Sequence, residues 1–263
     1  MKVLFRIVLI ASFALGQVSA QTPSGSPSKD PLKVAPEAYK LDFENDWVRV
    51  MRVRYGPRVK IPEHYHTERP AAYVYLTDSG PVIFKHIDLP YGAITRPALK
   101  AGSFRLYRAV KEVHSVENTS DIPSEFLRVE FKTEPVNQNS LHGKFHRETV
   151  APGENLRKIQ FDNEQIVVER LVIASKKSMD ISTNAAQPAL LVALTASEMN
   201  VSGAKRKEHL KLDAGTTIWI SEGQHRQLGN SSDTAVELLR FGFKTKPFND
   251  PTDRTRQSVV SSQ

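Results

Sequence analysis

The chain has 263 residues, of which 40% are hydrophobic and 25% are charged, a composition typical of a soluble globular protein. Its length allows two domains that each bury a core, and its formal net charge is +7. The densest basic cluster, Lys205-Arg206-Lys207, adjoins Glu208 and has no aromatic neighbours, so we expect no nucleic-acid partner. The sequence contains no cysteine, which excludes disulfides, thiol catalysis and Cys-ligated zinc.

Residues 1–20 differ from the rest of the chain. Lys2 and Arg6 precede a short apolar run, and the small-residue pattern Val18-Ser19-Ala20 follows it. This arrangement is typical of a signal peptide cleaved after Ala20. The alternative is an uncleaved membrane anchor, which needs roughly 20 apolar residues where this run offers about 10. We therefore expect an exported protein, periplasmic or extracellular, with no membrane span in its mature form.

The remaining chain is predicted to contain two folded units between polar ends. Residues 21–40 are rich in Pro and Ser, and residues 248–263 are polar, so both segments are expected to be flexible. The folded units are expected at 41–136 and 160–247, with a polar connector at 137–159.

An internal repeat supports this division. Phe43-Glu44-Asn45-Asp46 is echoed by Phe161-Asp162-Asn163-Glu164 at an offset of 118, and residues 127–135 are echoed by 239–247 at an offset of 112. Because the matches occur in the same order with one modest change of length, they indicate two copies of one domain.

Each unit is predicted to consist of strands. Leu127, Val129 and Phe131 alternate with polar residues, the period of a half-buried strand. Short β-rich runs separated by Gly, Pro and Asp follow one another through the first unit. The fold class is therefore all-β, with each unit a closed barrel or double-sheet jelly roll.

The first unit contains a set of histidines with metal-ligand character. His64 and His66 alternate along a predicted strand and can present two imidazoles to one face, and His114 on a later strand can supply a third. Three neutral imidazoles suit Fe, Mn, Ni, Cu or Zn and leave positions open for water or substrate. The alternative is a set of hydrogen-bonded histidines that line a metal-free pocket.

These motifs resemble the cupin superfamily, specifically a two-domain cupin (bicupin) built of two tandem double-stranded β-helix barrels. The resemblance implies that His64, His66 and His114 are metal ligands and that Asn118 ends the second motif. The family's glutamate ligand is missing, because Pro70 and Ala71 stand at its place. The resemblance leaves Glu68 as a possible fourth ligand.

The second unit departs further, since Ser182 and Asn184 stand where the first unit has His64 and His66. His225 lies within one residue of the position that matches His114. Alone, it is expected to be a packed or solvent-bonded histidine, so the second site is predicted to be degenerate.

The function expected from the sequence is a metal-dependent bicupin that acts on a small organic molecule. Tyr65, Tyr73, Tyr75 and Asn118 are candidates for lining its pocket. The alternative is a non-catalytic module that binds or senses a sugar or carboxylate without metal. Dioxygenase, isomerase and decarboxylase chemistry are all compatible with the resemblance, and the oligomeric state stays open.

Overall fold

We analysed a computed structural model, which describes residues 29–87, 89–110, 112–182, 187–203 and 207–248. The predicted signal peptide at 1–20, the first part of the segment 21–40, Asn184 and nearly all of the tail 248–263 lie outside these residues. Within the described residues, no helix has the length and apolar character to cross a membrane.

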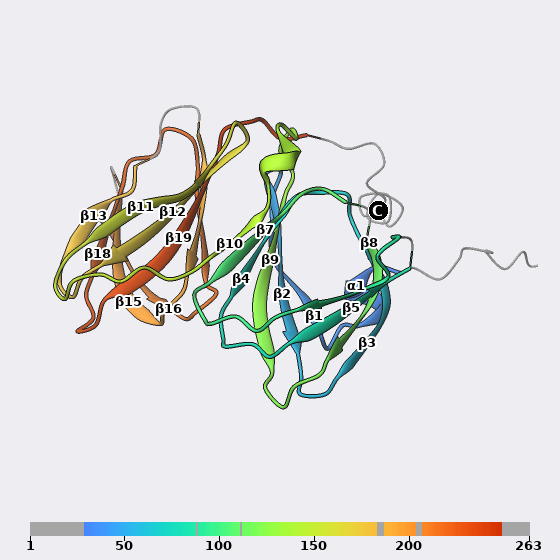
Figure 1. Cartoon of the computed structure of the whole chain (residues 1–263). Helices are drawn as coiled ribbons and strands as arrows, with labels where there is room; N and C mark the ends of the chain where they lie inside the picture. Colours follow the sequence, from blue (N-terminus) through green and yellow to red (C-terminus); the bar gives the residue numbers. More distant parts are fainter. Residues whose placement is uncertain (1–28, 88, 111, 183–186, 204–206, 249–263) are drawn as a thin grey trace, which may run out of the picture.

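The first folded unit, here called barrel 1, spans residues 39–145 and consists of two antiparallel sheets (Figure 1). The larger sheet has the order β1-β2-β9-β4-β7-β10 and the smaller one the order β3-β8-β5-β6. The strands are β1 (Tyr39–Glu44), β2 (Val48–Tyr55), β3 (Lys60–His66), β4 (Ala71–Tyr75), β5 (Val82–His86), β6 (Ala93–Arg96), β7 (Phe104–Tyr107), β8 (Glu112–Asn118), β9 (Ser124–Phe131) and β10 (Gly143–Phe145).

The second folded unit, barrel 2, spans residues 156–243 and repeats this architecture. Its sheets have the orders β11-β12-β19-β14-β17 and β13-β18-β15-β16, which match the orders of the equivalent strands in barrel 1 except that these two sheets contain no counterpart of β10. The strands are β11 (Leu156–Asp162), β12 (Ile166–Ile173), β13 (Ser178–Asp180), β14 (Ala189–Ala193), β15 (Ser197–Gly203), β16 (Lys207–Leu212), β17 (Thr217–Ile220), β18 (Arg226–Asn230) and β19 (Val236–Phe243).

Local details repeat as well. The β1–β2 register shifts between Leu41 and Phe43, and the β11–β12 register shifts between Ile159 and Phe161. The turn between each pair of strands is closed by an asparagine, Asn45 or Asn163, whose Oδ1 accepts two backbone N–H bonds. The prediction of an all-β chain made of two tandem jelly-roll barrels is confirmed.

The barrels pack against each other through their larger sheets. One apolar cluster contains Val50 and Phe131 from barrel 1 together with Val168 and Phe241 from barrel 2. Two further clusters fill the interiors of barrel 1 and barrel 2. The larger sheets are therefore covered on both faces, one by the barrel interior and the other by the neighbouring barrel (Figure 1).

This double covering corrects the expectation of a half-buried strand at 127–131. Arg128 and Glu130, predicted to face solvent, are 3% and 1% exposed and lie in the barrel interior. The alternation of polar and apolar residues in β9 thus separates a polar interior from an apolar interface. The same alternation on an isolated sheet would separate solvent from core.

The N-terminal segment 21–40 and the connector 137–159 both contain ordered structure. Residues from 29 onward include a short helix, α1 (Pro31–Val34), and Tyr39 begins β1 within the segment 21–40 that was expected to be flexible. In the connector 137–159, a single 3₁₀ turn, η1 (Gln138–Ser140), precedes β10, which pairs with β7, and β11 begins at Leu156. The strands in these segments form because they pair with strands of the folded units, although the local composition is typical of loops.

Candidate metal centre in barrel 1

The smaller sheet of barrel 1 brings the predicted histidines together. Strand β8 lies between β3 and β5, and the registers place His64 opposite His114 and His114 opposite His86. In the next row, His66 stands opposite Glu112. Because residues two apart on a strand share a face, the five side chains form two adjacent rows on one face of the sheet.

His64, His66 and His114 converge as predicted. Their ring centroids are 4.7 to 5.1 Å apart, and one nitrogen from each can be chosen so that all lie within 4.8 Å of one another. The three side chains are 0%, 3% and 1% exposed. This spacing allows three imidazoles to share one ion.

A second group of possible metal ligands shares His114 with the first, and its other two members were not predicted from the sequence. One ligand atom each from His86, Glu112 and His114 also lies within 4.8 Å of the others. The alternation that identified His64 and His66 applies equally to Glu112 and His114, and was the available signal for Glu112. His86 depends on the pairing of β5 with β8, which no local pattern reveals.

Glu68 is not part of the site. It is exposed in the turn between β3 and β4 and belongs to neither group of candidate ligands. The carboxylate that does lie beside the histidines is Glu112, which comes from β8 and is 4% exposed. Glu68 thus lies outside both groups of candidate ligands, because its side chain is exposed to solvent, whereas its neighbours Thr67 and Arg69 are buried.

Hydrogen bonds fix the orientation and tautomer of His64. Its Nδ1 lies 2.8 Å from the carbonyl oxygen of Pro62, which can only accept, so Nδ1 carries the proton. Its Nε2 therefore accepts from the Tyr39 hydroxyl at 2.9 Å. Tyr39 in turn lies 2.7 Å from the Tyr55 hydroxyl, which donates to it. Two tyrosines thus extend from His64 into the barrel.

The other imidazoles have buried nitrogens without hydrogen-bond partners. These are Nδ1 of His66, Nδ1 of His86 and both nitrogens of His114. Buried polar atoms in folded proteins are nearly always satisfied by protein, water or an ion. The set of four imidazoles and one carboxylate therefore fits a divalent transition metal, with His114 at the centre of both candidate groups.

The environment keeps the imidazoles neutral. Burial lowers the pKa of His64 to about 4, outweighing the bond to the Pro62 carbonyl, which acts in the opposite direction. Burial also holds the pKa values of His66 and His114 well below the usual value, and positive charge on Arg128 adds to the effect. Neutral imidazole is the form that coordinates a metal.

Arg128 supplies the main counter-charge of this interior. Its Nε lies 2.9 Å from Glu130, its Nη1 lies 3.9 Å from Glu112, and the guanidinium also donates to the Tyr73 hydroxyl. Both carboxylates are therefore aligned by the same arginine.

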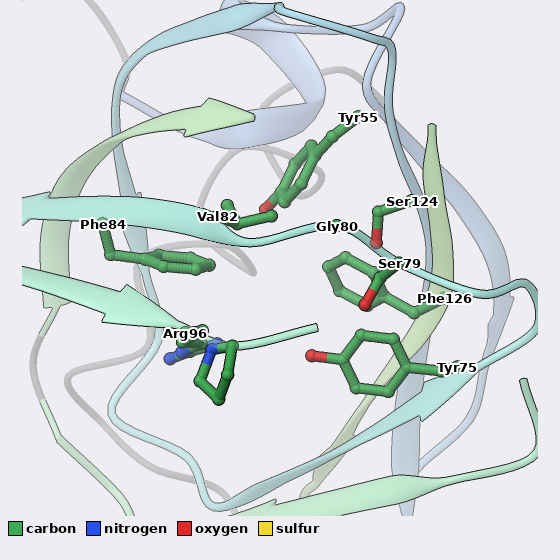
Figure 2. A pocket seen from close by; sticks show the side chains of 10 residues that line it. Tyr55, Tyr75, Ser79, Gly80, Val82, Phe84, Arg96, Ser124 and Phe126 are labelled. Carbon is green, nitrogen blue, oxygen red and sulfur yellow. The ribbon is translucent and has the colours of Figure 1, made fainter. Parts of the chain in front are cut away.

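Three of the four predicted lining residues lie in or beside barrel pockets. Tyr75 lines the pocket in Figure 2, and Tyr65 lines a smaller one beside His66 and α1. Tyr73 is buried between Arg96 and Arg128.

Asn118 has a structural role instead. Its Nδ2 donates to the carbonyls of Gly56 and Ile122 at 2.8 Å each, and its Oδ1 accepts from Ser120. It lines neither of these two pockets.

Barrel 2 offers no comparable arrangement among the residues that the structure describes, where both candidate ligand groups belong to barrel 1. Arg226 begins β18 at the position that matches His114, and its guanidinium bonds to Gln224. Ser182 bonds to the carboxylate of Asp180 instead of facing a ligand cluster.

No protein-family model matches the sequence, and no curated protein matches it. Solved structures are similar in fold. AerE from Microcystis aeruginosa has a TM-score of 0.54 at 12% identity, covering 78% of this chain and 97% of its own. A cupin 2 conserved barrel domain protein from Leptotrichia buccalis has a TM-score of 0.51 at 9% identity, covering 79% and 88%. Salicylate 1,2-dioxygenase from Pseudoaminobacter salicylatoxidans, described as adducts with gentisate, has a TM-score of 0.51 at 14% identity, covering 75% and 68%.

Proposed function

We propose that this chain, whose fold is that of the cupin superfamily in two tandem copies, binds one divalent transition metal in barrel 1 and acts there on a small organic molecule. The observation that carries the proposal is the convergence of buried, neutral imidazoles whose ring nitrogens include four without partners. A satisfied structural cluster would have paired these atoms.

His64, His66 and His114 are the residues proposed to hold the ion, with His86 and Glu112 adjoining them. Fe, Mn, Ni, Cu and Zn all accept imidazole, and the donor set does not select among them. Once bound, such an ion would act as a Lewis acid or activate oxygen. The salicylate dioxygenase neighbour is one precedent for a small organic substrate on this fold. The residues do not choose among dioxygenase, isomerase and decarboxylase reactions.

The alternative is a metal-free module that binds a small molecule. One observation favours it: both nitrogens of His64 already have hydrogen-bond partners, Pro62 and Tyr39. Under the metal proposal, the Tyr39 hydroxyl gives up Nε2 to the ion. Under the alternative, the bond to Tyr39 persists and the histidines contact the ligand directly.

We also propose export. The support is the charged and apolar pattern at 1–20, followed by Val18-Ser19-Ala20. A mature chain that begins at Gln21, measured by mass spectrometry of the exported protein, would agree with cleavage after Ala20. A chain that keeps residues 1–20 would contradict it.

Metal content tests the main proposal. Full-length mature protein without an affinity tag is stripped with chelator, offered each of the five metals, dialysed and analysed for elements. We expect close to one equivalent per chain and a rise in melting temperature on loading, because a ligand that binds only the folded state stabilises it.

The variants His66→Ala and His114→Ala should lose most of this metal, because each removes a direct ligand and even indirect changes cost ~10–100-fold in affinity. His225→Ala, in barrel 2, is the matched control and should retain it. Glu112→Gln tests whether the carboxylate is also a ligand. Wild-type protein that stays metal-free with all five ions would refute the metal proposal and leave the binding module.

A further inference from the structure

A pocket beside the candidate metal centre contains a buried arginine that forms no ion pair with any carboxylate that the structure describes. The pocket is lined by residues of β2, β4, β5, β6 and β9 and of the loops beside them, and includes Tyr55, Tyr75, Ser79, Phe84, Arg96 and Ser124. Figure 2 shows Tyr55, Tyr75 and Arg96 around one space, with the Tyr75 hydroxyl directed toward the arginine.

Arg96 is 5% exposed, and its Nη2 has no hydrogen-bond partner. Among the described residues, no carboxylate lies within ion-pair distance of its guanidinium. The buried carboxylates of barrel 1, Glu112 and Glu130, both lie within 4.0 Å of Arg128 instead. Burial of an unpaired charge is strongly unfavourable, so such a group points to a counter-charge from outside the chain.

Aromatic rings hold Arg96 in place. Its Cζ lies 4.0 Å from the ring centre of Phe84, 4.5 Å from that of Tyr107 and 4.9 Å from that of Tyr73. When aromatic rings cover the faces of a guanidinium, its in-plane N–H groups remain available to donate hydrogen bonds. A planar carboxylate matches that edge through parallel N–H···O bonds.

Two residues of the pocket contact the metal centre or its hydrogen-bond partners. Phe84 lines the pocket, and its ring centre lies 5.2 Å from that of His114. Tyr55 also lines the pocket and bonds to Tyr39, which bonds to His64. A small molecule held at Arg96 would therefore lie next to the proposed ion.

The charge balance of the interior agrees with an anionic occupant. Arg49, Arg96, Arg105 and Arg128 are among the buried cations of this barrel, against the two buried carboxylates Glu112 and Glu130. Neutral histidines add no charge, and a bound divalent ion would add two more positive charges. The interior therefore has an excess of positive charge before a ligand enters.

The cavity at Arg96 measures about 10 Å³, room for roughly one water molecule, so its lining side chains must move apart to admit a ligand. From these observations we infer that the site takes a small organic carboxylate, whose carboxylate group pairs with Arg96 while the Tyr75 hydroxyl lies within the same pocket. This inference rests on the proposed function and adds the substrate class. Arg96 is then a binding residue whose charge selects the ligand.

Calorimetric titration tests the inference with formate, acetate and propionate as probes, each beside its neutral amide. The full mature protein is used in two forms, stripped of metal and loaded with zinc. At least one acid should bind at millimolar concentration or below, and its amide should bind at least about tenfold more weakly, since one hydrogen bond to a charged group accounts for roughly that factor.

Arg96→Gln should lower affinity for the acid by roughly tenfold or more and leave the weak affinity for the amide unchanged. Arg96→Lys keeps the charge but loses the planar edge, so it should be intermediate. Arg226→Gln, an arginine in barrel 2, is the control and should bind like wild type. If Arg96→Gln fails to fold, Arg96→Lys and Tyr75→Phe carry the comparison.

Equal binding of acid and amide, no binding of any of the three acids, or wild-type affinity in folded Arg96 variants would each overturn the inference. The two protein forms separate it from the metal proposal. Acid binding through Arg96 in a protein that takes up no metal would support the carboxylate site while the metal proposal fails. Metal uptake without acid binding would do the reverse.

Discussion

Asn118 and Asn230 occupy matching positions in the two barrels, so replacing each by Ala tests whether both have the same structural role. Asn118 is 1% exposed and Asn230 is 3% exposed. Asn230 donates to the carbonyls of Ala174 at 3.1 Å and Thr234 at 2.8 Å, as Asn118 does to Gly56 and Ile122. Each side chain therefore ties the end of one strand to the turn after another.

The expected cost follows from these bonds. Each substitution removes two or three bonds from Nδ2 to backbone carbonyls, at about 1 kcal/mol each, so we expect a loss of about 2–4 kcal/mol in the free energy of unfolding. The bonds that Oδ1 accepts from Ser120 or Ser232 are lost as well, but water can replace them because both serines are partly exposed. For a chain of this size, about 1 kcal/mol corresponds to a shift of roughly 2–4 °C, so the melting temperature should fall on the order of 4–16 °C.

Thermal and urea unfolding of Asn118→Ala and Asn230→Ala measure this cost, with exposed Asn200→Ala as a control expected within about 0.5 kcal/mol of wild type. The two buried variants should lose similar stability, and both should bind metal like wild type at a temperature where they are folded. Unchanged stability combined with lost metal in Asn118→Ala would refute the structural role and return Asn118 to the ligand site.

Two further predictions concern individual side chains. Tyr39→Phe should lower the stability of the metal-free protein by about 1–2 kcal/mol and leave metal content near one equivalent, because it removes a hydrogen bond to His64 and no ligand; elemental analysis showing lost metal would make Tyr39 itself a ligand. For Glu169, burial acts to raise the pKa, but bonds from Arg157 and the charge of Arg240 outweigh it and the pKa is lowered. A lowered folded-state pKa stabilises above the unfolded value, about 4.3, and that stabilisation is lost as pH falls below it. Urea unfolding should therefore show Glu169→Gln less stable than wild type at pH 7, with the gap in unfolding free energy narrowing as pH falls below about 4.3; a gap independent of pH would contradict this account.

The architecture could be predicted from the sequence because short segments of the first unit recur in the same order in the second. Alternation along single strands was likewise enough to predict that His64 and His66 share a face. Their meeting with His114 was expected from the resemblance, and the β3–β8 register places it opposite His64.

The remaining part of the site depends on pairings that no local pattern encodes. His86 reaches the site through the register of β5 with β8, and Tyr39 bonds to residues 16 and 25 positions away. The segment around Tyr39 was expected to be flexible because its composition is Pro- and Ser-rich. The sequence pattern of β9 places Arg128 on the solvent side of a half-buried strand. In the structure the apolar face of β9 packs against barrel 2, so the polar face that carries Arg128 is the interior of barrel 1.

The sheet-to-sheet contact between the barrels gives the second barrel a purpose that does not require a ligand. Val50 and Phe131 of barrel 1 are fully or almost fully buried in a cluster that includes Val168 and Phe241 of barrel 2, and the ring centres of Phe131 and Phe241 are 6.1 Å apart. A truncated chain that ended near residue 136 would present a wide apolar sheet to water, the kind of surface that drives aggregation. Loss of the imidazoles from barrel 2 would therefore be tolerated, whereas loss of the barrel would not. The second barrel thus covers the apolar face of the first within one chain, whether or not it binds a ligand of its own.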